Sequence, residues 1–394
     1  MLRPGTFGLT LLLAMLTALG PLSTDMYLPS LPDIAHVLGA PVARTQLTIS
    51  SYLIGFAGGQ MIYGPLSDRY GRRPVLLAAI ALYLASTLAC AAAQSVDLLI
   101  VARLLQGISG SGAIVLARAI VRDVYSGVDA ARELSLMGSI SATAPIIAPI
   151  IGGLLQTVFG WRANFICMSA GGLIALLVAG RLLPETLGPG NRAHVFSMMR
   201  GYGAVARHRG FLIYLGIITT TYAGLFAWVS GASVVLQGIY GLSSVTFGFT
   251  FALGAAGYML GAMLATRLVT RLGLERTIAL GVVVIAAGGL ALALAVATGI
   301  PGLWLVAAMA LYLAGVGLAM PQAMAGALTP FPDRAGTAAS LMGLIQQTVA
   351  AIIAAIIGAF LVQSAWPVTA VVLTMSSLTS LLWISTRGLR ARLR

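Results

Sequence analysis

The sequence contains no lysine, and only 8% of its 394 residues are charged. Three histidines and two cysteines are too few and too scattered for a metal site or for a Ser-His-Asp or Cys-His catalytic arrangement. We therefore expect no enzymatic activity, no metal and no cofactor. A soluble protein of this length could not bury a chain that is 59% hydrophobic, so the composition favours an α-helical membrane protein.

The positive charge is distributed unevenly along the chain. All of it comes from arginine, and only Arg44, Arg103 and Arg162 fall outside the segments that we assign to the cytoplasm. This asymmetry follows the positive-inside rule. The formal net charge of +13 therefore reflects membrane topology and does not indicate a nucleic-acid partner. We expect a multi-pass protein of the bacterial inner membrane with both termini in the cytoplasm.

Hydrophobic runs long enough to cross a bilayer occur twelve times, because about 20 apolar residues span the hydrocarbon core. A polar interval separates the first six runs from the last six. The sequence therefore predicts an all-α membrane protein with two six-helix bundles, residues 1–183 and 211–394, joined by a cytoplasmic linker, residues 184–210. The predicted spans are 7–31, 45–66, 74–93, 98–120, 134–159, 163–183, 211–235, 245–265, 278–297, 303–325, 335–362 and 366–385.

An internal repeat supports the division into two halves. The tetrapeptide Ser135–Gly138 recurs as Ser340–Gly343, at an offset of 205 residues. Trp161 and Trp366 are related by the same offset, so the match stays in register beyond one helix. Duplicated halves that enclose a site near the membrane midplane are typical of transporters.

One acidic residue, Asp25, lies inside the apolar run from Pro4 to Pro32. A carboxylate at this depth costs about 2.5–3.5 kcal/mol, so it is rare without a function. The other nine acidic residues are predicted at helix ends or in loops. Asp25 is therefore the predicted proton-binding residue.

Arg103 is a basic residue predicted inside the fourth span, near its outer end. It follows Asp97 by six residues, and Asp25 precedes Pro32 by seven. At 1.5 Å per residue, both charged residues lie roughly 9–11 Å below the outer helix ends. An acid and a base at equal depth in a low dielectric should interact. The alternative is that the side chain of Arg103 extends to the membrane surface.

The loop after the second span, from Gly64 to Pro74, combines a Gly/Pro turn, an aspartate and a cluster of arginines. This pattern also fits a positive-inside anchor. The loop resembles the signature between helices 2 and 3 of the major facilitator superfamily. The resemblance implies a charge network that latches the two halves together. In the second half, Thr270 and Arg271 replace the Asp-Arg pair, so we do not expect a matching latch there. The implied latch residues are Gly64, Asp68, Arg69, Gly71, Arg72, Arg73 and, on helix 4, Asp123.

Two further stretches resemble antiporters of this superfamily. The fifth span resembles their Gly-Pro-x-x-Gly-Gly motif, with Ala148 in place of the first glycine, although prolines also kink ordinary membrane helices. The segment around Arg103 resembles the family's helix 4 motif, which implies a role in proton coupling. Ser23–Pro29 is most similar to the bicyclomycin- and chloramphenicol-resistance (Bcr/CflA) branch. The motif residues of the fifth span are Pro145, Pro149, Gly152 and Gly153.

The resemblance implies that a monomer exports small amphipathic drugs, phenicol- or bicyclomycin-like, by alternating access. Its partners would be the substrate, protons and the lipid bilayer, with the proton gradient as energy source and no cofactor. The alternative is a proton-coupled transporter of an amino acid or sugar on the same fold. An enzyme would need more acids or histidines at membrane depth, and a sensor would need a soluble domain. Residues predicted to line the cavity, although aromatic residues also pack helices together, are Tyr52, Gln106, Tyr222, Phe226, Phe251, Tyr258, Gln346 and Gln347.

Overall fold

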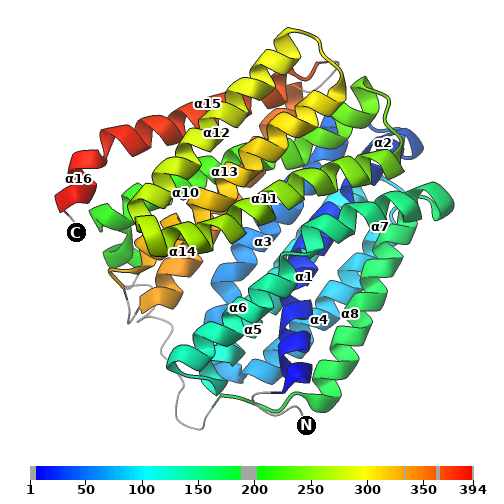
Figure 1. Ribbon diagram of the computed structural model, residues 1–394. Helices are drawn as coiled ribbons and strands as arrows, with labels where there is room; N and C mark the ends of the chain where they lie inside the picture. The colour runs from blue at the N-terminus through cyan, green and yellow to red at the C-terminus, as the bar shows by residue number, and fades with distance from the viewer. Residues whose placement is uncertain (1–5, 188–201, 332–333, 361–363, 393–394) are drawn as a thin grey trace. The chain divides into compact units, whose positions relative to one another are not determined.

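The computed structural model describes residues 6–187, 202–331, 334–360 and 364–392, and these ranges contain helices and no β-strand (Figure 1). The chain divides into two compact units, Met1–Val195 and Phe196–Arg394. Most of the predicted linker, residues 184–210, lies outside the described residues. The prediction of an all-α membrane fold is confirmed.

Each unit is a bundle of long helices with short connections. Unit 1 contains α1 (Phe7–Asp25), the 3-10 helix η1 (Leu28–Ser30), α2 (Leu31–Val37), α3 (Val42–Tyr70), α4 (Arg72–Ala91), α5 (Val96–Val124), α6 (Gly127–Ser141), α7 (Ala144–Phe159) and α8 (Arg162–Leu182). Unit 2 contains α10 (Arg209–Ser233), the π-helix η2 (Val234–Ile239), α11 (Ser244–Leu272), α12 (Leu274–Ala297), α13 (Gly302–Leu328), α14 (Ala335–Phe360), α15 (Trp366–Ser385) and α16 (Arg387–Arg392).

Eleven helical segments in the described ranges are long and apolar enough to cross a membrane. The predicted second span lies within α3, a 29-residue helix that is not among these eleven. Its polar side chains face the interior of unit 1: Gln46 and Thr48 are buried, and the hydroxyl groups of Thr48 and Tyr27 are 2.6 Å apart. Hydropathy therefore underestimates the ability of α3 to cross a membrane, because its polar side chains form hydrogen bonds within the protein.

The predicted first span, 7–31, is not one helix. α1 ends at Asp25, and the chain continues through η1, which has Pro29 in its first turn. Proline lacks the backbone N–H that would continue the α-helical hydrogen bonding, which explains the break. Asp25 is therefore the last residue of its helix.

The predicted fifth span, 134–159, is also divided. α6 ends at Ser141, and α7 begins at Ala144 with Pro145 in its first turn. Its repeat partner α14 has alanines in place of the two prolines and runs unbroken. Proline is favoured at the start of a helix and disfavoured inside one, so this difference follows directly from the sequence.

Glycines bring α3 and α5 into direct backbone contact. A Cβ at Gly107 on α5 would overlap the Tyr52 carbonyl, and one at Gly55 on α3 would overlap the Leu104 carbonyl. Such close approach lets two long helices pack along their length. It also holds Arg103 of α5 against the ring of Tyr52 on α3.

We expect Gly107→Ala to destabilise unit 1, because the added methyl group meets backbone that cannot move aside. Overpacking of this kind costs about 1–3 kcal/mol. The matched control is Gly58→Ala on α3, where a Cβ would meet nothing within 4 Å. The apparent Tm of detergent-purified protein measures the effect. An unchanged Tm for Gly107→Ala would contradict the observed packing.

Candidate functional site

Asp25 is buried at the end of α1. Asp25 is only 7% exposed, and its Oδ1 accepts a hydrogen bond of 2.9 Å from the hydroxyl of Thr24. Among the described residues, Asp25 takes part in none of the four ion pairs. A proton can therefore bind this carboxylate without breaking a salt bridge.

Arg103 is fully buried, with 0% of its surface exposed, so its side chain does not extend to the membrane surface. Nη1 donates to the backbone carbonyl of Ser23 at 2.9 Å and to Oε1 of Gln106 at 2.5 Å. The guanidinium carbon lies 4.4 Å from the ring centroid of Tyr52 and 4.7 Å from that of Tyr27. Cation–π contacts at this range stabilise a cation that has lost its water.

We expected Arg103 and Asp25 to interact, but among the described residues they form no ion pair. Arg103 binds the backbone of α1 two residues before Asp25, and its Nε and Nη2 have no hydrogen-bond partner among the described residues. Equal depth brought the two residues to the same end of α1, as predicted. Depth alone does not set the direction of a side chain. The rings of Tyr27 and Tyr52 hold the guanidinium of Arg103 against the Ser23 carbonyl.

A chain of hydrogen bonds extends the site to α4. Gln106 donates through Nε2 to the hydroxyl of Thr87 at 2.9 Å. The hydroxyl groups of Ser23 and Tyr83 are 2.7 Å apart. The end of α1 is thus tied to α5 by Arg103 and to α4 by the Ser23–Tyr83 hydrogen bond, and Gln106 ties α5 to α4.

Two residues predicted to line the cavity belong to this network. Tyr52 lies against the guanidinium of Arg103, and its hydroxyl donates to the Gly20 carbonyl at 3.3 Å. Gln106 links Arg103 to Thr87. Both are buried in unit 1, where they support Arg103, and contact with a substrate stays a prediction.

The antiporter-like stretch of α7 lies beside the end of α1. A Cβ at Gly152 would overlap the Met26 carbonyl, so the backbone of α7 touches the residue that follows Asp25. Asn164 of α8 donates to the Gly152 carbonyl at 3.3 Å and to the Ser30 hydroxyl at 2.8 Å. Gly153 and Pro149 are buried in the same helix. A shift of α7 would therefore displace the backbone at Met26, the residue after α1.

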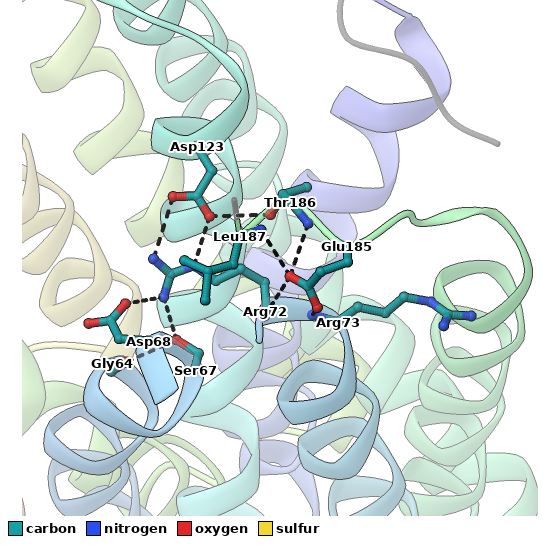
Figure 2. Close-up of polar contacts among 9 residues, drawn as sticks. All are labelled: Gly64, Ser67, Asp68, Arg72, Arg73, Asp123, Glu185, Thr186 and Leu187. Atoms are coloured by element: carbon teal, nitrogen blue, oxygen red, sulfur yellow. Dashed lines mark hydrogen bonds and ion pairs between the residues drawn. The ribbon is translucent and has the colours of Figure 1, made fainter. Parts of the chain in front are cut away.

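A second polar site, which we call the Arg72 cluster, lies at the α3–α4 end of unit 1 (Figure 2). The guanidinium of Arg72 points between two aspartates, as Figure 2 shows. Nε donates to Oδ2 of Asp123 on α5 at 2.8 Å, and Nη1 donates to Asp68 and to the Ser67 hydroxyl of α3. One buried side chain therefore joins α3, α4 and α5.

Glu185 completes this cluster from the segment after α8 (Figure 2). Its Oε1 accepts the backbone N–H of Arg72 at 2.9 Å, and its Oε2 accepts that of Arg73 at 3.1 Å. The unpaired N–H groups at a helix start favour an anion, so the carboxylate caps α4. Gly71 adopts φ +101° and a Cβ there would press on Oε2, so glycine is required at this turn.

Thr186 and Arg73 strengthen the same connection. The hydroxyl of Thr186 donates to Oδ2 of Asp123 at 3.2 Å, and Nη2 of Arg73 donates to the Gly180 carbonyl of α8 at 2.6 Å. Gly64 contributes its carbonyl, which accepts the Ser67 hydroxyl at 2.9 Å. Arg69 points outward, with its guanidinium 5.2 Å from the Tyr70 ring centroid.

The predicted cavity residues of unit 2 have uncharged side chains. Nε2 of Gln346 and Oε1 of Gln347 on α14 are buried without a hydrogen-bond partner in the described part of the chain. The rings of Tyr222 and Phe226 on α10 lie 4.6 Å apart. On α11, Phe251 stacks on Phe247 and Tyr258 is partly buried.

Three buried or bridging acidic and hydroxyl residues of unit 1 were not predicted from the sequence as part of a site. Glu185 and Thr186 look like ordinary loop residues, and their partners are more than 60 residues away in the chain. Glu133 was predicted at a helix end, but it lies inside α6, is 6% exposed and has an Oε1 without a hydrogen-bond partner among the described residues. Asp25 is therefore not the one buried carboxylate of unit 1. The signal for Glu133 was its place only one residue before a predicted span.

Two helical bundles that bury charged side chains define a multi-pass membrane protein of the transporter type. Residues 13–355 match the model of the Major Facilitator Superfamily, and the chain belongs to this family.

Relatives of known name are similar over most of their length. An uncharacterized MFS-type transporter of Bacillus subtilis is 35% identical, over 89% of this chain and 88% of the relative. A bicyclomycin resistance protein homolog of Haemophilus influenzae is 30% identical over 99% of both chains. A chloramphenicol resistance protein of Pseudomonas aeruginosa is 30% identical over 93% of this chain and 88% of its own. The solved structure of a D-xylose-proton symporter, 17% identical, shares the fold with a TM-score of 0.76 over 95% and 97% of the chains.

We expect Arg72→Ala to destabilise unit 1, because it leaves Asp68 and Asp123 without their cation. Removing one partner of such a partly buried ion pair costs about 1–3 kcal/mol. Arg69→Ala, which changes an exposed arginine in the last turn of α3, should leave the apparent Tm within experimental error. Equal effects of the two substitutions would show that Arg72 acts only as one of several surface charges.

The carboxylate of Glu185 also predicts a pH effect. Partial burial raises its pKa, but the backbone N–H groups of Leu187, Arg72, Arg73 and Thr186 outweigh this and hold the pKa below the ordinary value of about 4.5. The stabilisation is therefore complete above the ordinary pKa and is lost as the pH falls through the lowered one. The Tm of the parent should fall over this acidic range, and Glu185→Gln should flatten that fall. An identical Tm–pH curve for Glu185→Gln would contradict the capping role.

Proposed function

We propose that this protein exports small, neutral, amphipathic drugs of the phenicol or bicyclomycin type across the inner membrane in exchange for protons. The observation that carries the proposal is Asp25, a buried carboxylate that ends α1 and forms no ion pair among the described residues. Because Arg103 is held by the Ser23 carbonyl, the carboxylate can gain and lose a proton while the guanidinium stays in place. The resistance proteins named above support the choice of drugs as substrates.

The surroundings of Asp25 link its protonation to movement. Its neighbour Met26 touches Gly152 of α7, and the preceding turn of α1 binds Arg103. A change of charge at Asp25 alters the electrostatic energy of Arg103, since Coulomb interactions are strong where water is excluded. Alternating access driven by proton exchange at this point is the mechanism we propose.

The chemistry of unit 2 supports neutral substrates. Its acidic residues are Glu275 and Asp333, and both stand outside the predicted spans. The buried amides of Gln346 and Gln347 have unused hydrogen-bonding atoms, which suit the hydroxyl and amide groups of a neutral drug. A cationic substrate would lack a counter-charge in this unit.

The test is drug transport in membrane vesicles with an imposed pH gradient. Asp25→Asn should abolish proton-driven chloramphenicol transport, because an amide cannot carry the proton. The matched control is Asp97→Asn, since the Asp97 side chain is 64% exposed and pairs at the surface with Arg44. Proton-driven transport at the parent rate in Asp25→Asn would exclude Asp25 as the proton carrier. Failure of the parent to transport either chloramphenicol or bicyclomycin would overturn the substrate class.

A further inference from the structure

Unit 2 contains an ion pair at its α11–α12 end that the sequence motifs do not indicate. Nε of Arg390 on α16 donates to Oε2 of Glu275 at 3.0 Å. The hydroxyl of Tyr214 on α10 donates to Oε1 of the same carboxylate at 2.6 Å. We call these three residues the Arg390 clamp. Glu275 lies in the first turn of α12, where the helix dipole favours an anion.

The guanidinium of Arg390 is buried between Glu275, Trp383 and Thr386. Only 4% of its side-chain surface is exposed, and its guanidinium carbon lies 3.5 Å from the ring centroid of Trp383. Nη1 donates to the Trp383 carbonyl at 2.8 Å and to the Thr386 hydroxyl. This burial distinguishes the pair from exposed surface ion pairs, which contribute little.

The clamp joins helices that are distant in the sequence. Arg390 and Glu275 are separated by 115 residues, and Glu275 and Tyr214 by 61. The ring of Tyr214 also packs on Gly326 of α13, where a Cβ would collide with it. The ends of α10, α12, α13 and α15 are therefore held together through the three side chains of the clamp, Tyr214, Glu275 and Arg390.

The corresponding place in unit 1 is occupied by Glu185. The third long helix of each half starts after a glycine with positive φ, Gly71 before α4 and Gly273 before α12. In unit 1, a carboxylate from the chain after α8 binds the start of α4. In unit 2, a guanidinium from the chain after α15 binds the carboxylate at the start of α12. Both connections tie the chain after the last long helix to the start of the third, but Glu185 binds backbone N–H groups whereas Arg390 binds a carboxylate side chain.

This explains how unit 2 manages without an Asp-Arg pair in its loop. The hydroxyl of Thr270 donates to the Arg267 carbonyl of its own helix and so forms no link to α12. The tie between α12 and the rest of the bundle is made instead by Arg390, beyond the last membrane-crossing helix. Sequence comparison of the two loops cannot show this, because the tie does not come from the loop.

We propose that Arg390 is a positioning residue for transport: its pairing with Glu275 makes the α11–α12 end of unit 2 move as one body during the transport cycle. The clamp itself is independent of the substrate. Its consequence for turnover rests on the proposed transport function, so the experiment has two parts that fail separately.

The first part is a double-mutant cycle on purified full-length protein, without substrate. Arg390→Ala and Glu275→Ala should each lower the apparent Tm, and the double variant should lose less than the sum of the two single losses, because the Arg390–Glu275 pair is already lost in each single variant. Arg387→Ala, an exposed arginine on the same short helix, is the control and should match the parent. Additive losses, or no loss in Arg390→Ala, would overturn the clamp. Should Arg390→Ala not fold, Tyr214→Phe, which removes one donor to Glu275, replaces it under the same criteria.

The second part measures chloramphenicol transport per folded molecule in vesicles. Arg390→Ala should lower the turnover by about fivefold or more with an unchanged KM, because the residue contacts helix ends and not a substrate. A variant that is merely less stable would keep the parental turnover once the amount of folded protein is matched. Parental turnover in Arg390→Ala would therefore overturn the positioning role. A parent that transports no drug, with a coupled Tm cycle intact, would overturn the proposed substrate and leave the clamp established.

Discussion

A charge that has been removed from water must be stabilised by its neighbours, and this constraint organises unit 1. Arg103 satisfies it with the Ser23 carbonyl, the Gln106 amide oxygen and two aromatic rings. None of these partners is a carboxylate. The arginine therefore stabilises the end of α1 without forming an ion pair with Asp25. An ion pair between the two would make protonation of Asp25, the proposed proton carrier, costlier.

The same constraint acts at the helix ends. The Arg72 cluster and the Arg390 clamp each place a buried guanidinium against a carboxylate from a distant part of the chain, Asp123 in one case and Glu275 in the other. In both units, the segment that leaves the last long helix is tied to the start of the third. Helix bundles that exchange between conformations need such ties, since packing of apolar faces alone gives little orientation in a membrane. The two halves thus reach a common mechanical solution with different residues.

Much of this arrangement follows from the sequence, and the remainder has a physical reason. Hydropathy and charge predicted the helical fold, the two halves and the positions of Asp25 and Arg103. The family resemblance predicted Asp68 and Arg72 in the loop and Asp123 on helix 4, and the structure brings these three together. Glu185 and Arg390 were missed because their partners are 112 to 115 residues away. The partner of Arg103 was wrong, because helical depth fixes where a side chain starts and not where it points. Contacts with a substrate in the predicted cavity remain predictions.

The central claim is that Asp25 exchanges a proton when drug binds. Purified protein in weakly buffered detergent solution should release protons on addition of chloramphenicol, and a pH-sensitive dye can measure this release. Asp25→Asn should bind the drug without releasing protons. Proton release of equal size in the parent and in Asp25→Asn would contradict the account.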